Sequence, residues 1–324
     1  MKVRKTLLVL SALCCLSLVA CRERTEELVF SYDELRITPS TTKALIEGDY
    51  TSSTDINRIS VVYGEDPKLL DAFIKNTGIE SNRFSVTLTD LKVNTTYYYC
   101  IEFANEIESR RTSISSFATL VYSEQSGEIN GYAYVDLGLP SGLKWATCNV
   151  GATSPTDYGD YFAWGEIIPK DVYDWGTYQH WNDTNGDGDW NSILDEFTIN
   201  SDISSNTQYD AAIANWGKGW RMPTEDEVQE LVDYCDLQQT KVNEVEGFVV
   251  IGPNGSCIFF PAAGCHYESS FLDAGVSGLY WSSTPDSVYF YFDGSAYAFH
   301  FNNDRKYVDD RPCFWGLSVR PVSD

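Results

Sequence analysis

Two different hydrophobic patterns divide the chain into two parts. Between residues 28 and 120, short runs alternate apolar and polar positions, and turn-forming residues separate the runs. In one of these runs Phe84, Val86 and Leu88 share a face. A two-residue period is typical of half-buried strands, and several short strands at this spacing predict an all-β sandwich of about seven strands.

From residue 131 onwards the pattern is irregular and includes two segments with helical spacing. Residues 210–217 begin with Asp and end with Gly, which predicts a short helix with a glycine stop. After the capping box Thr224-x-x-Glu227, apolar residues recur with helical spacing and predict one amphipathic helix. Residues 288–292 and 295–301 alternate around an Asp-Gly pair, which predicts a β-hairpin. This part is therefore expected to be an irregular α+β domain.

The first twenty residues have the pattern of a targeting segment. Three basic residues precede an uncharged, mostly apolar run over residues 6–20, which is shorter than a membrane-spanning helix needs. The run ends in Leu18-Val19-Ala20-Cys21, which resembles the lipobox of bacterial lipoproteins. We expect residues 1–20 to be a signal peptide, Cys21 to carry the lipid and residues 21–27 to be a tether. We then expect the lipid to be the protein's only contact with a membrane. The expected location is the cell envelope, at the outer membrane, and exposure on the cell surface is left open.

The net charge of −24 is unevenly distributed. Residues 22–125 hold 17 acidic and 11 basic side chains, whereas residues 126–324 hold 30 and 9, together with all nine tryptophans. This change in composition places a linker at residues 121–130, between one domain over 28–120 and another over 131–324. The acidic excess excludes a protein that binds the nucleic-acid backbone, because such a protein needs a basic face.

The first domain resembles a fibronectin type III domain in Leu91-x-Val93-Asn94-Thr95-x-Tyr97 and in the closing strand Ser116-Phe117-Ala118-Thr119. In that family the hydroxyl of such a tyrosine corner ties back to the upstream backbone. Two departures stand out: Val93 and Asn94 replace the usual Pro and Gly, and no tryptophan is available for the core. We expect this domain to be a spacer that lifts the next domain off the membrane, with protein binding as the alternative.

The second domain resembles the Fibrobacter succinogenes major paralogous domain along most of its length. That family is related to C-type-lectin-like folds, which are irregular α+β domains rich in Trp and Gly turns, and no activity is established for it. The resemblance therefore implies a C-type-lectin-like fold and no particular chemistry. The matching segments are VDLGLPSGLKWATCNVGA (135–152), YGDYFAWGE (158–166), WRMPT (220–224), FPAAG (260–264), YWSST (280–284) and SVRP (318–321).

The stretch Arg221-Met222-Pro223-Thr224-x-x-Glu227 also resembles a segment of formylglycine-generating oxidases. Those enzymes need a pair of reactive cysteines close to the C-terminus, where this chain has only Cys313. We therefore expect the stretch to begin a structural helix, with Arg221 paired internally.

Residues 183–191 fit the first half of an EF-hand-like calcium loop. Oxygen-bearing side chains alternate and Gly follows at the sixth position, but the twelfth position is Leu194 where such a loop has Glu. Calcium is thus the candidate cofactor, and a hydrated turn without metal is the alternative. The expected ligands are Asp183, Asn185, Asp187, Asp189, Asp195 and Glu196.

Six cysteines remain once the signal peptide is removed and Cys21 is lipidated, and in an exported chain these are disulfide candidates. Fifteen pairings are possible, of which we favour Cys148–Cys235 and Cys257–Cys265. Cys265 also adjoins His266, but neighbours in a strand point to opposite faces, so we expect no thiolate nucleophile there.

Aromatic residues could serve the core or a ligand, because exposed rings stack on the apolar C–H faces of sugars. The rings next to the acidic loop, Trp175, Tyr178 and Trp181, are the ligand-binding candidates. No nucleophile–base pair, zinc spacing or phosphate loop stands out, so we expect no enzyme. The sequence predicts a lipid-anchored adhesion or binding module for an extracellular glycan or protein. A structural surface scaffold and an unrecognised glycan-active or modifying enzyme are the alternatives.

Overall fold

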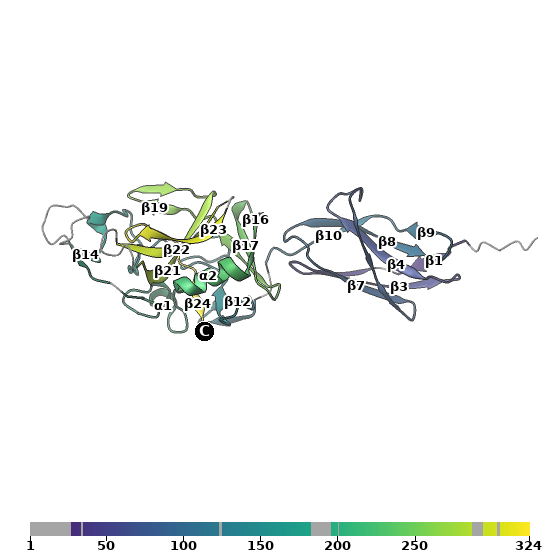
Figure 1. The fold of residues 1–324 in the computed structure, drawn as a ribbon, viewed down its shortest axis with the longest axis horizontal. Coiled ribbons are helices and arrows are strands. Elements are labelled where there is room, and N and C mark those ends of the chain that lie inside the picture. The colour runs from purple at the N-terminus through teal and green to yellow at the C-terminus, as the bar shows by residue number, and fades with distance from the viewer. Residues whose placement is uncertain are drawn as a thin grey trace, which may run out of the picture.

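The computed structural model describes residues 27–33, 35–122, 125–182, 196–199, 201–286, 294–302 and 305–324. These residues form two units that lie end to end, a sandwich and a larger mixed unit (Figure 1). The predicted signal peptide and the predicted lipidation site at Cys21 lie outside the described residues. Within the described part of the chain, no helix is long and apolar enough to cross a membrane.

The first unit is a sandwich of two antiparallel sheets, as its alternating pattern predicts. One sheet has the order β1-β3-β7-β6 with β2 beside β3, and the other has the order β10-β8-β4-β5 with β9 beside β8. The strands are β1 (Phe30–Tyr32), β2 (Arg36–Pro39), β3 (Ala44–Ser52), β4 (Arg58–Gly64), β5 (Phe73–Asn76), β6 (Gly78–Glu80), β7 (Arg83–Leu88), β8 (Thr96–Ala104), β9 (Ser109–Arg111) and β10 (Ser115–Ala118).

Phe and Tyr rings fill the sandwich core in place of a tryptophan. Phe103 is fully buried, and its ring centroid lies 4.2 Å from that of Phe30, 5.8 Å from that of Tyr50 and 5.9 Å from that of Phe84. Each buried ring removes a large apolar area from water, so the cluster supplies much of the hydrophobic stabilisation of this unit.

The predicted tyrosine corner is present. Tyr97 is buried, and its hydroxyl accepts a hydrogen bond from the backbone N–H of Lys92 at 3.0 Å. This bond fixes the approach of the chain to β8, the strand that carries Tyr97 in the middle of the second sheet.

The two residues that depart from the fibronectin type III pattern contact the second unit. The backbone N–H of Val93 donates to Gln238 Oε1 at 3.2 Å, and Nδ2 of Asn94 donates to the carbonyl oxygen of Lys241 at 3.0 Å. The side chain of Val93 lies in an apolar cluster that joins the two units. Its other members include Val121, Val242, Val245, Val249, Ile251, Cys257 and Phe259.

The second unit combines small antiparallel sheets with two short helices. In its described residues the sheet orders are β11-β12-β13-β24, β14-β15, β16-β17-β18, β19-β20 and β21-β22-β23. Strand β11 lies within the predicted linker, and because it pairs with β12 it belongs to this unit. The first strands are β11 (Gly127–Ile129), β12 (Tyr132–Asp136), β13 (Lys144–Ala146), β14 (Trp181–Asn182), β15 (Glu196–Phe197) and β16 (Asp236–Val242). The later strands are β17 (Val245–Ile251), β18 (Cys257–Pro261), β19 (Cys265–Tyr267), β20 (Ser270–Leu272), β21 (Ser277–Pro285), β22 (Ser295–Asn302), β23 (Lys306–Pro312) and β24 (Val322–Ser323).

Both predicted helices form. Helix α1 (Ala211–Trp216) begins at Asp210, whose Oδ1 accepts from the N–H of residue 212 at 2.8 Å, and ends at Gly217 with φ of 83°. Helix α2 (Glu225–Tyr234) begins with the reciprocal bonds of the capping box between Thr224 and Glu227. These caps satisfy backbone groups at the helix termini that would otherwise lack partners.

Strand β22 separates two hydrophobic cores. Its alanines, Ala296 and Ala298, pack into one core, and its phenylalanines, Phe299 and Phe301, pack into the other. Both edges of β22 are paired, one with β21 and the other with β23. The predicted hairpin partner, residues 288–292, lies outside the described residues.

Candidate functional site

Four aromatic side chains from three segments surround a hollow of about 360 Å³ in the surface of the second unit. Trp175 opens the 3₁₀-helix η1 (Trp175–Thr177), Tyr267 ends β19, and Phe314 and Trp315 follow β23. We call this hollow the aromatic cleft. Its remaining lining residues are Ser295, Asp310 and Pro312.

The rings of the aromatic cleft are tilted against one another. The centroids of Trp175 and Phe314 are 4.7 Å apart with an angle of 53° between the ring planes, and those of Tyr267 and Trp315 are 5.5 Å apart at 70°. None of these contacts is a parallel stack, and Phe314 is the buried ring of the four. Trp175, Tyr267 and Trp315 are each partly exposed to solvent.

Local backbone geometry holds the rings in place. The N–H of Trp315 donates to the carbonyl of Pro312 at 3.0 Å, which closes a turn directly after β23. Gly316 then exchanges two backbone hydrogen bonds with His266, the neighbour of Tyr267. A Cβ atom at Gly316 would lie 2.7 Å from the ring of Tyr173, so only glycine permits this close approach.

A second hollow of about 350 Å³ adjoins the aromatic cleft and shares Asp310, Pro312 and Trp315 with it. We call it the polar hollow, because Arg311 and His300 line it together with Asp273. Its remaining lining residues are Cys265 and Leu279.

Arg311 and His300 are joined in one hydrogen-bonded group. Arg311 donates from Nη1 to Asp309 Oδ2 at 2.7 Å and from Nη2 to His300 Nδ1 at 2.9 Å, and the hydroxyl of Tyr307 lies 2.7 Å from the same histidine nitrogen. Burial, and then the positive charge of Arg311, lowers the pKa of His300. A neutral imidazole whose Nδ1 accepts a hydrogen bond is the form that fits this geometry.

The three predicted ligand-binding residues lie in different environments. Trp175 lines the aromatic cleft. Trp181 is partly buried, with its ring centroid 5.9 Å from that of Trp175. The assignment of Tyr178 to a ligand surface is wrong, because this side chain is only 5% exposed and its hydroxyl donates to the carbonyl of Trp164 at 2.9 Å.

The predicted calcium ligands at positions 183–195 lie outside the described residues. Of Glu196 only the backbone is described, and it pairs with Asn182 between β15 and β14. In the part of the chain that the structure describes, no group of three or more His, Cys, Asp or Glu side chains is placed to hold a metal. Calcium at this loop therefore stays a prediction.

The two favoured disulfides are not formed in the structure. Cys148, Cys235 and Cys265 are free thiols, so neither the Cys148–Cys235 nor the Cys257–Cys265 disulfide is present. The physical reason is that the members of each pair pack in different hydrophobic clusters. Cys148 and Cys235 lie against separate cores of the second unit, and Cys257 belongs to the cluster that joins the two units.

The adjacent Cys265 and His266 serve the packing of this region. Burial raises the pKa of Cys265 to about 11, so its thiol is protonated at neutral pH. The imidazole of His266 stacks on the ring of Phe271, with centroids 4.8 Å apart. These environments favour a structural role for both residues.

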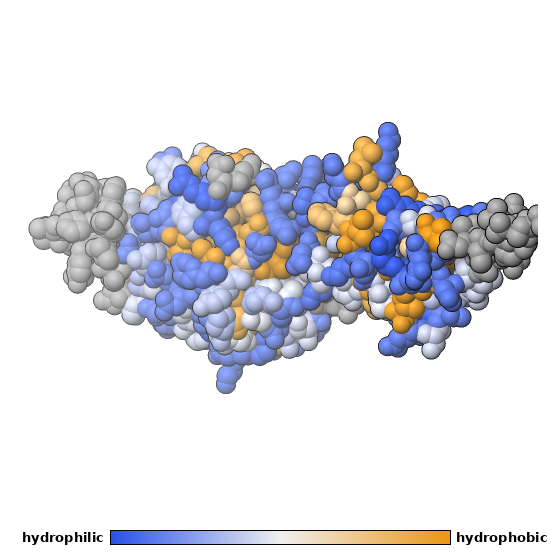
Figure 2. Space-filling model, turned by 45° about the vertical axis from the view of Figure 1, so that its right-hand side comes forward, coloured by the Kyte–Doolittle hydropathy of each residue, from blue (hydrophilic) through white to orange (hydrophobic). Residues whose placement is uncertain are grey.

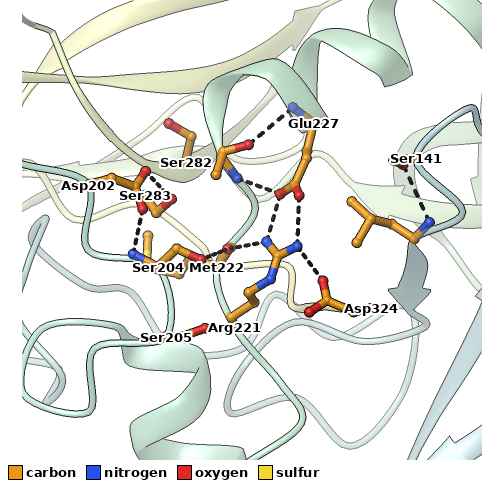
Figure 3. A network of polar contacts seen from close by, with 12 residues as sticks. Ser141, Asp202, Ser204, Ser205, Arg221, Met222, Glu227, Ser282, Ser283 and Asp324 are labelled. Carbon is orange, nitrogen blue, oxygen red and sulfur yellow. Dashed lines mark hydrogen bonds and ion pairs between the residues drawn. The ribbon is translucent and has the colours of Figure 1, made fainter.

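Arg221 is paired internally, as expected. Its Nη1 and Nη2 atoms each lie 2.7 Å from a carboxylate oxygen of Glu227, and Nη2 also contacts Asp324 Oδ1 at 2.7 Å (Figure 3). The bidentate pair ties the start of α2 to the end of the described chain. This arrangement agrees with a structural role for the stretch that resembles the oxidases.

Another cavity, of about 630 Å³, lies where the linker meets the second unit. Tyr132 and Trp216 line it, but their rings stack on each other at 3.8 Å and nearly in parallel. One face of each ring is therefore already used. The aromatic cleft brings four rings from three segments together around one hollow and is the better candidate site.

Most of the aromatic cleft was not predicted from the sequence. Tyr267, Phe314 and Trp315 were not among the candidates, because they are distant from the acidic loop in sequence. One available signal was the adjacent pair Phe314-Trp315 directly after Pro312-Cys313, since two large rings next to a chain-breaking proline are expected near a turn at the surface.

No protein-family model matches the chain, and no curated protein matches it. Among solved structures, a redesigned β-sandwich protein is 26% identical with a TM-score of 0.23, and the match covers 28% of this chain and 93% of that chain. The sensor domain of the anti-sigma factor RsgI4 of Pseudobacteroides cellulosolvens is 21% identical with a TM-score of 0.24, over 31% and 82% of the two chains. The fn3 domain of the human collagen alpha-1(XX) chain is 15% identical with a TM-score of 0.24, over 30% and 90%.

The first unit is a fibronectin type III-like sandwich. This assignment rests on its strand order and on the hydrogen bond of Tyr97 to the backbone of Lys92. The resemblance of the second unit to the Fibrobacter succinogenes major paralogous domain, and through it to C-type-lectin-like folds, stays a prediction.

Proposed function

We propose that this chain is a lipid-anchored protein of the bacterial cell envelope whose second unit binds an extracellular carbohydrate without transforming it. The observation that carries the proposal is the aromatic cleft, in which Trp175, Tyr267, Phe314 and Trp315 converge from separate segments around a surface hollow. Ligand pockets are commonly lined by aromatic side chains with a few polar groups, and the apolar C–H faces of sugar rings match aromatic platforms.

The negative charge of the second unit favours a neutral carbohydrate ligand over an anionic one. Residues 126–324 hold 30 acidic and 9 basic side chains, so an anionic polysaccharide would be repelled at long range. A neutral glycan meets no such barrier. In this proposal the second unit has the C-type-lectin-like fold that its sequence implies, and the fibronectin type III-like sandwich holds it away from the membrane.

A second candidate function, protein binding by the sandwich, is favoured by one observation. Leu70, Phe73 and Ile74 are 74%, 64% and 61% exposed, and the last two lie on β5, an edge strand of its sheet. Figure 2 shows apolar side chains gathered over this unit. Exposed apolar side chains on an unpaired strand edge provide a contact surface for other proteins.

A glycan array probed with residues 22–324, with and without calcium chelation, tests the carbohydrate proposal. We expect binding to neutral glycans that Trp175→Ala weakens at least tenfold. Tyr234→Ala is the matched control, because Tyr234 is an aromatic residue of the same unit, 55% exposed on α2 and outside the cleft. Failure to bind any glycan would contradict the proposal, as would chemical turnover of a bound one. The lipid anchor is tested separately by membrane fractionation. Recovery of the Cys21→Ser variant in the same membrane fraction as the wild-type protein would contradict the anchor.

A further inference from the structure

The aromatic cleft and the polar hollow share a wall formed by Trp315 and the end of β23. The two hollows have volumes of about 360 and 350 Å³, which lie near the lower end of the range of ligand pockets. Because their linings share Asp310, Pro312 and Trp315, the two hollows are adjacent compartments.

The two compartments offer complementary chemistry. The aromatic cleft provides rings for apolar sugar faces, and the polar hollow provides the guanidinium of Arg311. Within the described residues, Arg311 donates hydrogen bonds to Asp309, to His300 and to the carbonyl of Asp310, which uses three of its five N–H groups. The other two remain able to donate to ligand hydroxyls, and the planar group is held in position by the bonds already made.

Trp315 adds an unused donor on the shared wall. Its indole Nε1 is shielded from solvent and has no hydrogen-bond partner among the described residues. A buried donor without a partner is energetically costly, and an acceptor oxygen supplied by a ligand would remove that cost. Such a group commonly indicates a missing partner.

The local charges indicate a neutral ligand. Arg311 is already paired with Asp309, and Asp273 also lines the polar hollow, so its surroundings hold no excess positive charge. A phosphate, sulfate or carboxylate would meet these acidic side chains, whereas the hydroxyl groups of a neutral sugar can both donate and accept.

We propose that the aromatic cleft and the polar hollow are adjacent subsites that bind a neutral glycan of at least two sugar units, with Trp315 in contact with both units and Arg311 selecting the second. This inference rests on the proposed carbohydrate function and adds to it the length and charge of the ligand.

Titration calorimetry of residues 22–324 with oligosaccharide ladders tests the subsites. The probes are cello-, laminari-, manno- and chito-oligosaccharides of one to four units. We expect the affinity in at least one series to rise tenfold or more from one unit to two. Arg311→Met removes this gain, and Arg311→Lys, which keeps the charge but loses the planar fork, also reduces it. Arg305→Met is the control, because Arg305 lies on the neighbouring turn and does not line either hollow.

The possible outcomes separate the two proposals. If sugars bind but one unit binds as tightly as four, or if Arg311→Met and Arg311→Lys leave the length dependence intact, the subsites are overturned and the proposed function stands. If no series binds, the proposed carbohydrate function fails and the subsites fail with it. Circular dichroism of each variant confirms that it is folded, and Arg311→Lys provides the measurement if Arg311→Met is not.

Discussion

At the scale of single residues, Arg320 carries a buried charge that hydrogen bonds and the ring of Phe260, 4.3 Å from the guanidinium carbon, compensate. It is 1% exposed and forms no ion pair within the described part of the chain. Its N–H groups donate to Asn149 Oδ1 and to the carbonyl oxygens of Ala146, Thr147 and Phe259 at 2.8–3.1 Å. Burial lowers the pKa of Arg320. The guanidinium therefore ties the end of β13 and strand β18 to the segment before β24.

Replacing Arg320 by lysine tests this role. Lysine keeps a positive charge, but its single ammonium cannot reach acceptors on three sides, so buried carbonyl groups lose their donors. We expect Arg320→Lys to lower the free energy of unfolding by about 3 kcal/mol, measured by urea denaturation. Arg36→Lys is the control, because the Arg36 side chain is 50% exposed, and it should change stability by less than about 0.5 kcal/mol. Equal effects of the two substitutions would argue against a special role for Arg320.

At the scale of elements, the sequence correctly predicted the features that depend on interactions between residues close together in the chain. The caps of α1 and α2, the alternation of β7 and the tyrosine corner each depend on residues close together in the chain, and all four are present. The disulfides and the aromatic cleft depend on long-range packing, which spacing along the chain does not reveal. Tyr178 illustrates the difference: its neighbours Thr177 and Gln179 are exposed, whereas its own side chain is buried and its hydroxyl donates to the carbonyl of Trp164.

The first turn of α2 yields a pH-dependent prediction. Burial alone would raise the pKa of Glu227, but hydrogen bonds from Arg221 and from Thr224 outweigh it and lower the pKa in the folded state. In the window between the two pKa values the unfolded chain then binds more protons, so stability falls with falling pH. The contribution of the pair is present above the pKa of glutamate in the unfolded chain and is lost as the pH drops through the folded value.

We expect Glu227→Gln to destabilise the protein by about 2 kcal/mol at pH 7, because Arg221 loses its charged partner. The gap between wild type and Glu227→Gln should close as the pH falls below 4, when the wild-type carboxylate is also protonated. Chemical denaturation at several pH values measures both effects. Glu244→Gln, at a side chain that is 92% exposed, is the control. A gap that stays constant down to pH 3 would contradict the assigned charge state.

At the scale of the whole molecule, the sandwich contacts the second unit at the two positions where it departs from the fibronectin type III pattern. Val93 and Asn94 stand where the fibronectin type III family has Pro and Gly, and both bond to the strand β16 of the second unit. A proline at position 93 would lack the N–H that reaches Gln238, and a glycine at 94 would lack the amide. Thr41 adds a further hydrogen bond, to the carbonyl of Gly255 at 3.0 Å. These contacts favour a fixed arrangement, which would hold the aromatic cleft at a defined distance from the sandwich.

Introducing the Pro and Gly of the fibronectin type III pattern should release that arrangement. Val93 lies in the cluster between the units and not in the core of the sandwich, so Val93→Pro with Asn94→Gly removes contacts across the junction and leaves the sandwich core intact. We expect small-angle X-ray scattering of residues 22–324 to give a broader distribution of interatomic distances for the double variant. Calorimetry should resolve the unfolding of the two units into more widely separated transitions. Ile107→Ala, at an exposed position of the sandwich, should change neither measurement. Identical scattering curves for the wild type and the double variant would mean that the apolar cluster alone fixes the junction, and that Val93 and Asn94 contribute little to it.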